Sequence, residues 1–253
     1  AIDTQAPTLT LSANQIASDN VINLSEAEGG LVTYSGTVES NIQSVTASIG
    51  VSSFSSIGAS PAIAVNANNG TWSLTLSKVQ LQAALGNALT GQLSAQFTAT
   101  DAAGNTTVTS PRVVSVDMDP PAVPIYTIPG IGVGDSKILA SEVAPNGSLT
   151  LTGTTQASSD SVLVTVHQTS FQPVQTGTNW SLTLTQAQLA SLQGSGISIA
   201  VKVTDSAGNS TTLTQSGLTI ATIAPTKPTV LTPISEDTFI NKVEADGGVT
   251  ITG

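Results

Sequence analysis

Aspartate and glutamate are the residues of this chain whose type and spacing could do chemistry. In three segments an aspartate is followed seven residues later by a glutamate: Asp19 and Glu26, Asp135 and Glu142, and Asp237 and Glu244. Carboxylate oxygens are hard ligands. Ca²⁺ takes six to eight such oxygens in a flexible geometry, whereas Mg²⁺ keeps several of its waters. The repeated spacing therefore favours Ca²⁺ over Mg²⁺ as the metal that these segments would hold.

Further carboxylates recur in two other settings. Asp101 and Asp205 open the turns DAAGN and DSAGN, and proline-containing stretches hold Asp3, Asp117 and Asp119. Thirteen of the 16 acidic residues lie in recurring segments of these kinds. The formal net charge of −10, in a chain with only 9% charged residues, is therefore concentrated at a few places.

The recurring segments divide the chain into repeats. A linker-like stretch returns at residues 2–11, 116–128 and 220–231, and Trp72 and Trp180 lie 108 residues apart in the matched sequences GTWSLTLSKVQL and GTNWSLTLTQAQL. Internal periods of this kind indicate tandem domains. We predict two full repeats, residues 1–117 and 118–221. Residues 222–253 would be the start of a third, incomplete repeat with at most two strands.

Each repeat has the pattern of an all-β Ig-like domain. Residues 31–38, 44–51, 71–77, 93–101 and 108–117 alternate apolar and polar side chains, with many β-branched residues between glycine- and asparagine-containing turns. Short helices are expected at 78–89 and 185–193. The pattern predicts antiparallel β-sandwiches of about seven strands per repeat, arranged in tandem in an extended rod. Trp72 and Trp180 are expected in the cores, not as exposed platforms for sugars.

The composition excludes several functions. Six scattered basic residues cannot form the phosphate-binding patch of a nucleic-acid binder. No apolar run is long enough to span a bilayer, so membrane insertion is not expected. The chain has no cysteine and one histidine, His167, which excludes disulfides and cysteine-based zinc sites and makes a His-based triad unfavourable. His167 lies in an alternating segment and is expected to be a surface strand residue.

Sandwich topology predicts where the carboxylates meet. The loop after the first strand should lie at the same end of the sandwich as the outgoing linker, and the DxAGN turn should lie at the opposite end. Six carboxylates would then converge between the first two repeats: Asp19, Glu26, Glu28, Asp117, Asp119 and Asp205. Like charges at such distances repel unless a cation neutralises them, so we expect Ca²⁺ at this junction.

The acids have an alternative role, and the second junction differs from the first. The acids could instead be solvated loop caps, with Asp101 and Asp205 holding the amides of their own turns. The next junction should also differ, because aligning the linkers places Ala221 and Ile223 where Asp117 and Asp119 stand and adds Lys227. We predict weak or no Ca²⁺ binding there, although Asp135 and Glu142 could hold an ion within their own loop.

These motifs resemble those of a known family. DNVINLSEAEGG, TDAAGN, the WSLTL strand and linkers of the form D-x-x-AP are typical of the bacterial Ig-like repeats of giant type I-secreted, RTX-type surface adhesins of Gram-negative bacteria, Salmonella among them. The resemblance covers essentially the whole chain. The second repeat departs from the pattern, with SKIL in place of NVIN and a proline at 145. The resemblance implies a rod of Ig-like domains that Ca²⁺ stiffens between domains.

A structural role is the leading functional prediction. The chain is expected to be a spacer segment of a secreted, cell-surface adhesin that projects a distal binding region for cell adhesion or biofilm formation. Its partners would be neighbouring Ig-like repeats, with host-cell or biofilm ligands bound through other regions, and the chain itself is expected to be monomeric. The alternative is an Ig-like module that itself binds glycan or protein, which the scarcity of aromatic residues disfavours. An enzyme is not expected.

Overall fold

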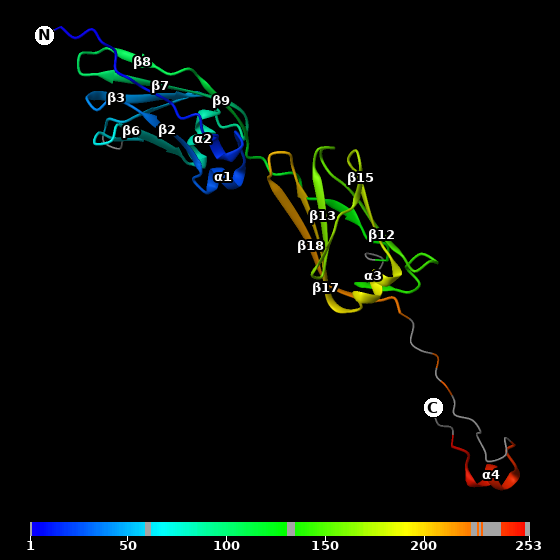
Figure 1. Ribbon diagram of the computed structural model, residues 1–253. Helices are drawn as coiled ribbons and strands as arrows, with labels where there is room; N and C mark the ends of the chain where they lie inside the picture. The colour runs from blue at the N-terminus through cyan, green and yellow to red at the C-terminus, as the bar shows by residue number, and fades with distance from the viewer. Residues whose placement is uncertain are drawn as a thin grey trace. The chain divides into compact units, whose positions relative to one another are not determined.

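The computed structural model describes residues 2–58, 62–130, 135–223, 227, 229 and 239–250, apart from the side chain of Glu244. The described chain is built mainly of β-strands in four sheets, which confirms the all-β, Ig-like fold class (Figure 1). Its contacts define two compact units. The first comprises Ala1–Ile128, Thr150–Thr183 and Ser198–Ser216, and the second Pro129–Leu149, Leu184–Ile197 and Gly217–Gly253. The predicted domain boundaries do not follow this division and stay predictions.

The first half of the chain forms two sheets with the strand orders β1-β9-β7-β3-β4, with β8 beside β7, and β2-β6-β5. Every pair is antiparallel except β1 with β9, which run parallel. The strands are β1 Val21–Ile22, β2 Val32–Thr37, β3 Ile42–Ile49, β4 Ser52–Ser55, β5 Ile63–Asn66, β6 Thr71–Leu76, β7 Thr90–Asp101, β8 Thr106–Val108 and β9 Arg112–Asp117.

The second half repeats this plan. Its sheets have the orders β10-β12-β16-β15 and β11-β18-β17-β13-β14, and β11 runs parallel to β18 as β1 does to β9. The strands are β10 Ile125–Thr127, β11 Lys137–Leu139, β12 Leu149–Thr154, β13 Ser161–Val166, β14 Thr169–Phe171, β15 Val174–Thr176, β16 Asn179–Leu184, β17 Gly194–Thr204 and β18 Ser210–Ala221.

Helices are few and short: the 3-10 turn η1 Ile16–Ser18, and α1 Leu24–Glu28, α2 Lys78–Ala84, α3 Gln186–Ser191 and α4 Lys242–Gly247. Capping boxes start α1, α2 and α3, because the side chains of Asn23, Ser77 and Thr185 accept the N–H three residues on. α2 and α3 confirm the predicted helices. α2 ends before residue 89, since Gly86 and Asn87 take left-handed φ values of 67° and 72°.

The first core is centred on aromatic residues from both sheets. Trp72 and Tyr34 lie 4.5 and 5.5 Å from Phe97 between ring centroids, and all three side chains are buried. The indole N–H of Trp72 donates to the carbonyl of Thr10 across Gly36. Trp180 is likewise buried. Both tryptophans are core residues, as predicted.

Two strand predictions differ from the structure. The expected strand 108–117 is split at Pro111 into β8 and β9, which pair with different halves of β7. Proline has no N–H to give to a ladder, so it interrupts the pairing. Each half of the described chain also has nine strand segments instead of about seven. In the third repeat the described residues form α4 and no strand.

Position 36 requires glycine because its neighbours leave no room for a Cβ; its φ is not left-handed. A Cβ there would overlap the Thr10 carbonyl oxygen and lie 2.9 Å from Nε1 of Trp72. We expect Gly36→Ala to lower the free energy of unfolding by about 1–3 kcal/mol, measured by urea denaturation. Gly247→Ala is the control, because nothing lies within 4 Å of its Cβ position. Equal stabilities of the two variants would contradict this account.

Tyr34 gives a second prediction. Its hydroxyl is buried and has no hydrogen-bond partner in the described structure. Burial raises its pKa to about 12, with Arg112 acting in the opposite direction. Since a tyrosine in the unfolded chain ionises near pH 10, this group destabilises the fold as the pH rises from about 10 to 12. Tyr34→Phe should be at least as stable at neutral pH and should lose less stability above pH 10 in thermal melts.

Candidate functional site

The predicted metal ligands mostly serve as acceptors for nearby backbone amides. One carboxylate oxygen accepts an N–H two residues on in the loops at Asp3 (3.1 Å), Asp19 (2.8 Å), Asp117 (3.1 Å) and Asp135 (3.0 Å). Two glutamates accept from the backbone N–H three residues before them: Glu26 from Asn23 N–H (3.1 Å) and Glu142 from Leu139 N–H (2.7 Å). The interpretation of these acids as turn and cap formers is therefore correct for one oxygen of each.

The two DxAGN turns use their aspartates fully. Oδ1 of Asp101 accepts from the N–H groups of Ala103 and Asn105, and Oδ2 accepts from the Asn105 side-chain amide at 2.8 Å. Asp205 makes the same three hydrogen bonds in its own turn. The hydrogen bond from the Asn105 side chain is the main cause that lowers the pKa of Asp101. Both carboxylates thus have their oxygens engaged in the turn.

The asparagine of each turn also holds a linker. Nδ2 of Asn105 donates to the Asp3 carbonyl (3.3 Å), and Nδ2 of Asn209 donates to the Asp117 carbonyl (3.0 Å). Two positions further on, the hydroxyls of Thr107 and Thr211 donate to the carbonyls of prolines 7 and 121. We call each such asparagine and threonine pair a linker clamp.

The two clamps use equivalent residues, since their linker carbonyls are 114 positions apart and their turn side chains 104 positions apart. Sequence reasoning singled out the DxAGN turns but assigned their chemistry to the aspartates. The missed signal was the asparagine that closes each motif, followed two residues later by a threonine. The turn aspartate orients this asparagine, and the asparagine fixes the linker backbone.

The acidic loop and the outgoing linker lie at the same end of the first sandwich, as predicted. The parallel register pairs Val21 with Ser115 and Ile22 with Val116, so the residues after β1, from Asn23 on, lie beside Asp117 at the end of β9, and Asp19 lies abreast of an earlier part of that strand. Within the same compact unit, Oδ1 of Asn209 accepts the N–H of Leu24 at 2.7 Å. The second DxAGN turn is therefore linked to the start of α1.

The predicted convergence of six carboxylates on Ca²⁺ stays a prediction. Among the residues that the structure describes, no three acidic or histidine side chains are grouped closely enough to hold a metal ion. Glu28 is taken by an exposed ion pair with Lys78 at 2.9 Å. The second oxygens of Asp19 and Asp117, and both oxygens of Asp119, accept no hydrogen bond within the described chain. Carboxylate oxygens of this kind are the ligands that Ca²⁺ takes.

The later acidic loops are built differently. Glu142 lies against Gly130, where a Cβ would stand 2.6 Å from its carboxyl carbon, and no helix follows Asp135 as α1 follows Asp19. Asp237 lies outside the described residues. Glu244 belongs to α4, and its side chain is likewise outside the description. The α1 helix itself was missed from the sequence, although Asn23 and Glu26 carry the capping-box spacing.

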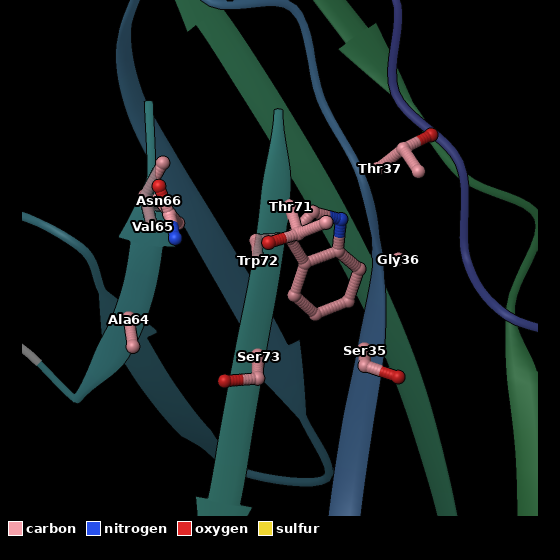
Figure 2. A pocket seen from close by; sticks show the side chains of 9 residues that line it. All are labelled: Ser35, Gly36, Thr37, Ala64, Val65, Asn66, Thr71, Trp72 and Ser73. Atoms are coloured by element: carbon pink, nitrogen blue, oxygen red, sulfur yellow. The ribbon is translucent and has the colours of Figure 1, made fainter. Parts of the chain in front are cut away.

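Other candidate sites do not gather reactive groups. His167 is exposed at the tight turn between β13 and β14 with a φ of 55°, so it is a surface residue as expected but not a strand residue. A hollow of ≈ 560 Å³ lies over β2, β6 and β5 (Figure 2), and Ser35, Thr37 and Ser73 line it. Trp72 in its wall is buried, with 2% of its surface exposed. This hollow has no exposed aromatic ring on which a sugar could stack.

The described chain also has no helix that is both long and apolar enough to cross a membrane.

The sheets and the paired loops define an all-β protein of Ig-like sandwiches. Residues 1–118 match the family model described as a bacterial Ig-like domain. Among characterised proteins compared by sequence, none matches the chain.

Several solved structures resemble the chain. A Ca²⁺-stabilized adhesin of an Antarctic bacterium that binds ice is 29% identical, with a TM-score of 0.45, over 96% of this chain and 56% of its own. A 1.5-MDa bacterial ice-binding adhesin is 23% identical, with a TM-score of 0.38, over 87% and 66%. Fibronectin(III)-like modules of Clostridium thermocellum CbhA are 14% identical, with a TM-score of 0.39, over 88% and 100%. The chain thus spans about half to two thirds of the two adhesin structures.

The turn geometry predicts a pH effect. Because the pKa of Asp101 is lowered in the folded chain, its hydrogen bonds stabilise the fold above the ordinary carboxyl pKa. This stabilisation is lost as the pH falls through the lowered value. Asn105→Ala should raise the pKa of Asp101 toward its ordinary value, measured by carboxyl NMR titration. An unchanged pKa in this variant would show that the asparagine is not the main cause.

The linker clamps predict a difference between neighbouring threonines. Thr107→Val removes the donor to the carbonyl of residue 7 and should lower the free energy of unfolding by about 1 kcal/mol. Thr106→Val, one residue earlier on β8, is the matched control because its exposed side chain makes no hydrogen bond in the described structure. Thr211→Val and Thr212→Val form the equivalent pair on β18. The clamp is refuted if denaturation shows each pair to be equal.

Proposed function

We propose that this chain is a structural spacer segment of a bacterial surface adhesin, stiffened by Ca²⁺ at the ends of its Ig-like domains. The observation that carries the proposal is the β1–β9 register, which brings the segment after Ile22, with Glu26, beside the outgoing linker at Asp117. Two segments far apart in sequence thereby bring carboxylate oxygens that accept no hydrogen bond to one end of the sandwich.

The residues with oxygens to spare are the proposed ligands. Asp19, Asp117 and Asp119 each have at least one such oxygen, and Glu26 has one beyond its cap. Bound Ca²⁺ would supply the positive charge that cancels their repulsion. The chain's own residues set the geometry: the caps and turns hold one oxygen of each carboxylate, and the linker clamp fixes the backbone at Asp117. Glu28, Asp101 and Asp205 are engaged elsewhere and contribute less.

The match of residues 1–118 to the bacterial Ig-like domain model supports a place at the cell surface. We propose that neighbouring repeats are the direct partners, that the segment is monomeric, and that it projects a distal region that binds host-cell or biofilm ligands. Type I secretion would bring the parent protein to the surface. The uncharged, hydroxyl-rich sheet faces suit a solvated spacer: cross-strand pairs such as Thr33 with Thr75 (2.9 Å) place hydroxyls side by side on them.

Calorimetry and small-angle scattering test this function together. Calcium should bind, and adding a chelator should change the maximum dimension or the flexibility of the chain. The double variant Asp117→Asn with Asp119→Asn should lose at least one binding event and the matching part of the scattering change. Glu39→Gln is the control, since Glu39 lies outside the acidic loops and its bond to Thr8 N–H survives in glutamine. Identical scattering profiles with and without chelator would sink the stiffening mechanism.

The linker following the second repeat yields a separate prediction. Ala221 and Ile223 replace the carboxylates of the first linker, and Lys227 adds a positive charge. Titration with Ca²⁺ should therefore resolve a stronger event that depends on Asp117 and Asp119 and, at most, a weaker one elsewhere. Replacing Ala221 and Ile223 by aspartate should strengthen the weaker event. Two equal events in the natural chain would contradict this asymmetry.

A further inference from the structure

The chain enters and leaves each half along neighbouring parallel strands. In the first half β1 precedes the rest of the sheet, β9 ends it, and Val21 and Ile22 lie abreast of Ser115 and Val116. In the second half β11 lies beside β18 in the same way, with Lys137 abreast of Thr219. The N–H of Ser115 donates to the carbonyl of Asn20, and that of Thr219 to Ser136.

This arrangement fixes how tension acts on the fold. When the two chain ends are pulled apart, β1 is drawn backward along its axis and β9 forward along the same axis. Their hydrogen bonds, which lie across the strands, are then loaded together in shear. An antiparallel pair whose strands are pulled apart at their open end is instead opened one bond at a time. The parallel pair is therefore the contact that must fail before the sandwich can extend.

In the first half a side chain reinforces this contact. The Arg112 guanidinium, at the start of β9, donates to the carbonyl of Asn14 (3.0 Å) and to Oδ1 of Asn20 (2.7 Å). Oδ1 of Asn20 also accepts the N–H of Ile16 (3.2 Å), so the arginine ties the whole segment that leads into β1 to the last strand. Charge-assisted hydrogen bonds of this kind are stronger than neutral ones.

The segment that Arg112 holds has strained backbone. Ala17, Ser18 and Asn20 take left-handed φ values of 52°, 66° and 69°. Residues held in this region persist only where the surroundings fix them. Residue 216 stands at the position equivalent to 112, three before the strand pairing begins, and is a serine. In the part of the second half that the structure describes, Ser216 makes no such tie, and the parallel pair has three residues, Lys137–Leu139.

We propose that this chain bears tension, and that β1 with β9, bound through Arg112, forms a shear clamp that sets how long the first half resists force. The pair β11 with β18 is the corresponding clamp of the second half. The shear clamp is made of protein contacts alone, so it operates without calcium. The proposal is independent of the calcium-stiffened spacer: a load-bearing chain needs no metal, and a calcium site needs no clamp.

Constant-force single-molecule extension of the full chain in chelator tests the proposal. Two unfolding steps are expected, each lengthening the chain by roughly 300 Å for about 100 residues. Forced unfolding is governed by the unfolding rate. Arg112→Ser, which installs the residue of the second half, should therefore shorten the lifetime of one step about tenfold and leave the other unchanged. Ser216→Ala is the control and should change neither step.

A second pair of variants probes the backbone contact. Ser115→Pro removes the N–H that donates to Asn20. Val113→Pro places the same ring two residues earlier on β9, before the pairing with β1 begins. Only the first should shorten the lifetime of the first half. Circular dichroism checks that both variants fold. If Ser115→Pro does not fold, the lifetime of Arg112→Ser tests the proposal.

Changing the direction of pulling tests the proposal without altering the shear clamp. The chain has no cysteine, so handles can be attached at two introduced ones. Thr90 and Asp117 lie opposite each other at one end of the β7–β9 pair, and pulling there opens that pair bond by bond. We expect lifetimes about tenfold shorter than for end-to-end pulling. Equal lifetimes in the two directions, or no effect of Arg112→Ser, would overturn the proposal.

Discussion

The segment that leads into each sandwich is hydrogen-bonded to both sheets, and the other features depend on this. In the first half, residues 10 and 12 donate to β2 of one sheet, and a few residues later Val21 and Ile22 join β9 of the other. The crossing occupies residues 13–20, where η1 and three left-handed residues turn the chain. In the second half, β10 joins β12 and β11 joins β18. Because the entering segment reaches the last strand, the acidic loop lies beside the outgoing linker.

The acids at this end have two uses that do not exclude each other. A carboxylate has two oxygens, and the turns and caps use one of them in Asp19, Asp117 and Glu26. The bond to the backbone orients the side chain and leaves the second oxygen for a cation or for water. In the DxAGN turns both oxygens are used, so Asp101 and Asp205 act on the linker through asparagine. Aspartate therefore has two roles: in the loops it keeps one oxygen unbonded, and in the DxAGN turns both of its oxygens orient the asparagine.

The sequence predicted the sandwich class, the two short helices, the buried tryptophans and the end at which the first acidic loop lies. These follow from alternation of apolar residues and from the direction in which strands run. It did not predict α1, because a helix of five residues is too short to show helical periodicity, and the spacing of Asn23 and Glu26 is its main local signal. It did not predict the linker clamps, since the asparagine and threonine recur locally but their partner, such as the Asp3 carbonyl 102 residues from Asn105, cannot be identified from that local pattern. Carboxylate convergence could not be judged from residue types, because it depends on which oxygens the turns already occupy.

The position of the charges matters more than their number. Uncharged hydroxyl pairs such as Thr150 with Thr183 at 2.9 Å lie on the sheet faces, whereas most acids lie in loops and linkers. Changing the cation concentration would thus alter the repulsion at the ends of the sandwiches while leaving the strand pairing as it is. The strand pairing includes the parallel contact that resists extension. In the two proposals, stiffening by calcium and resistance to unfolding rest on different residues, so one could vary between repeats without changing the other: Arg112 has no counterpart at Ser216, and Asp117 has none at Ala221.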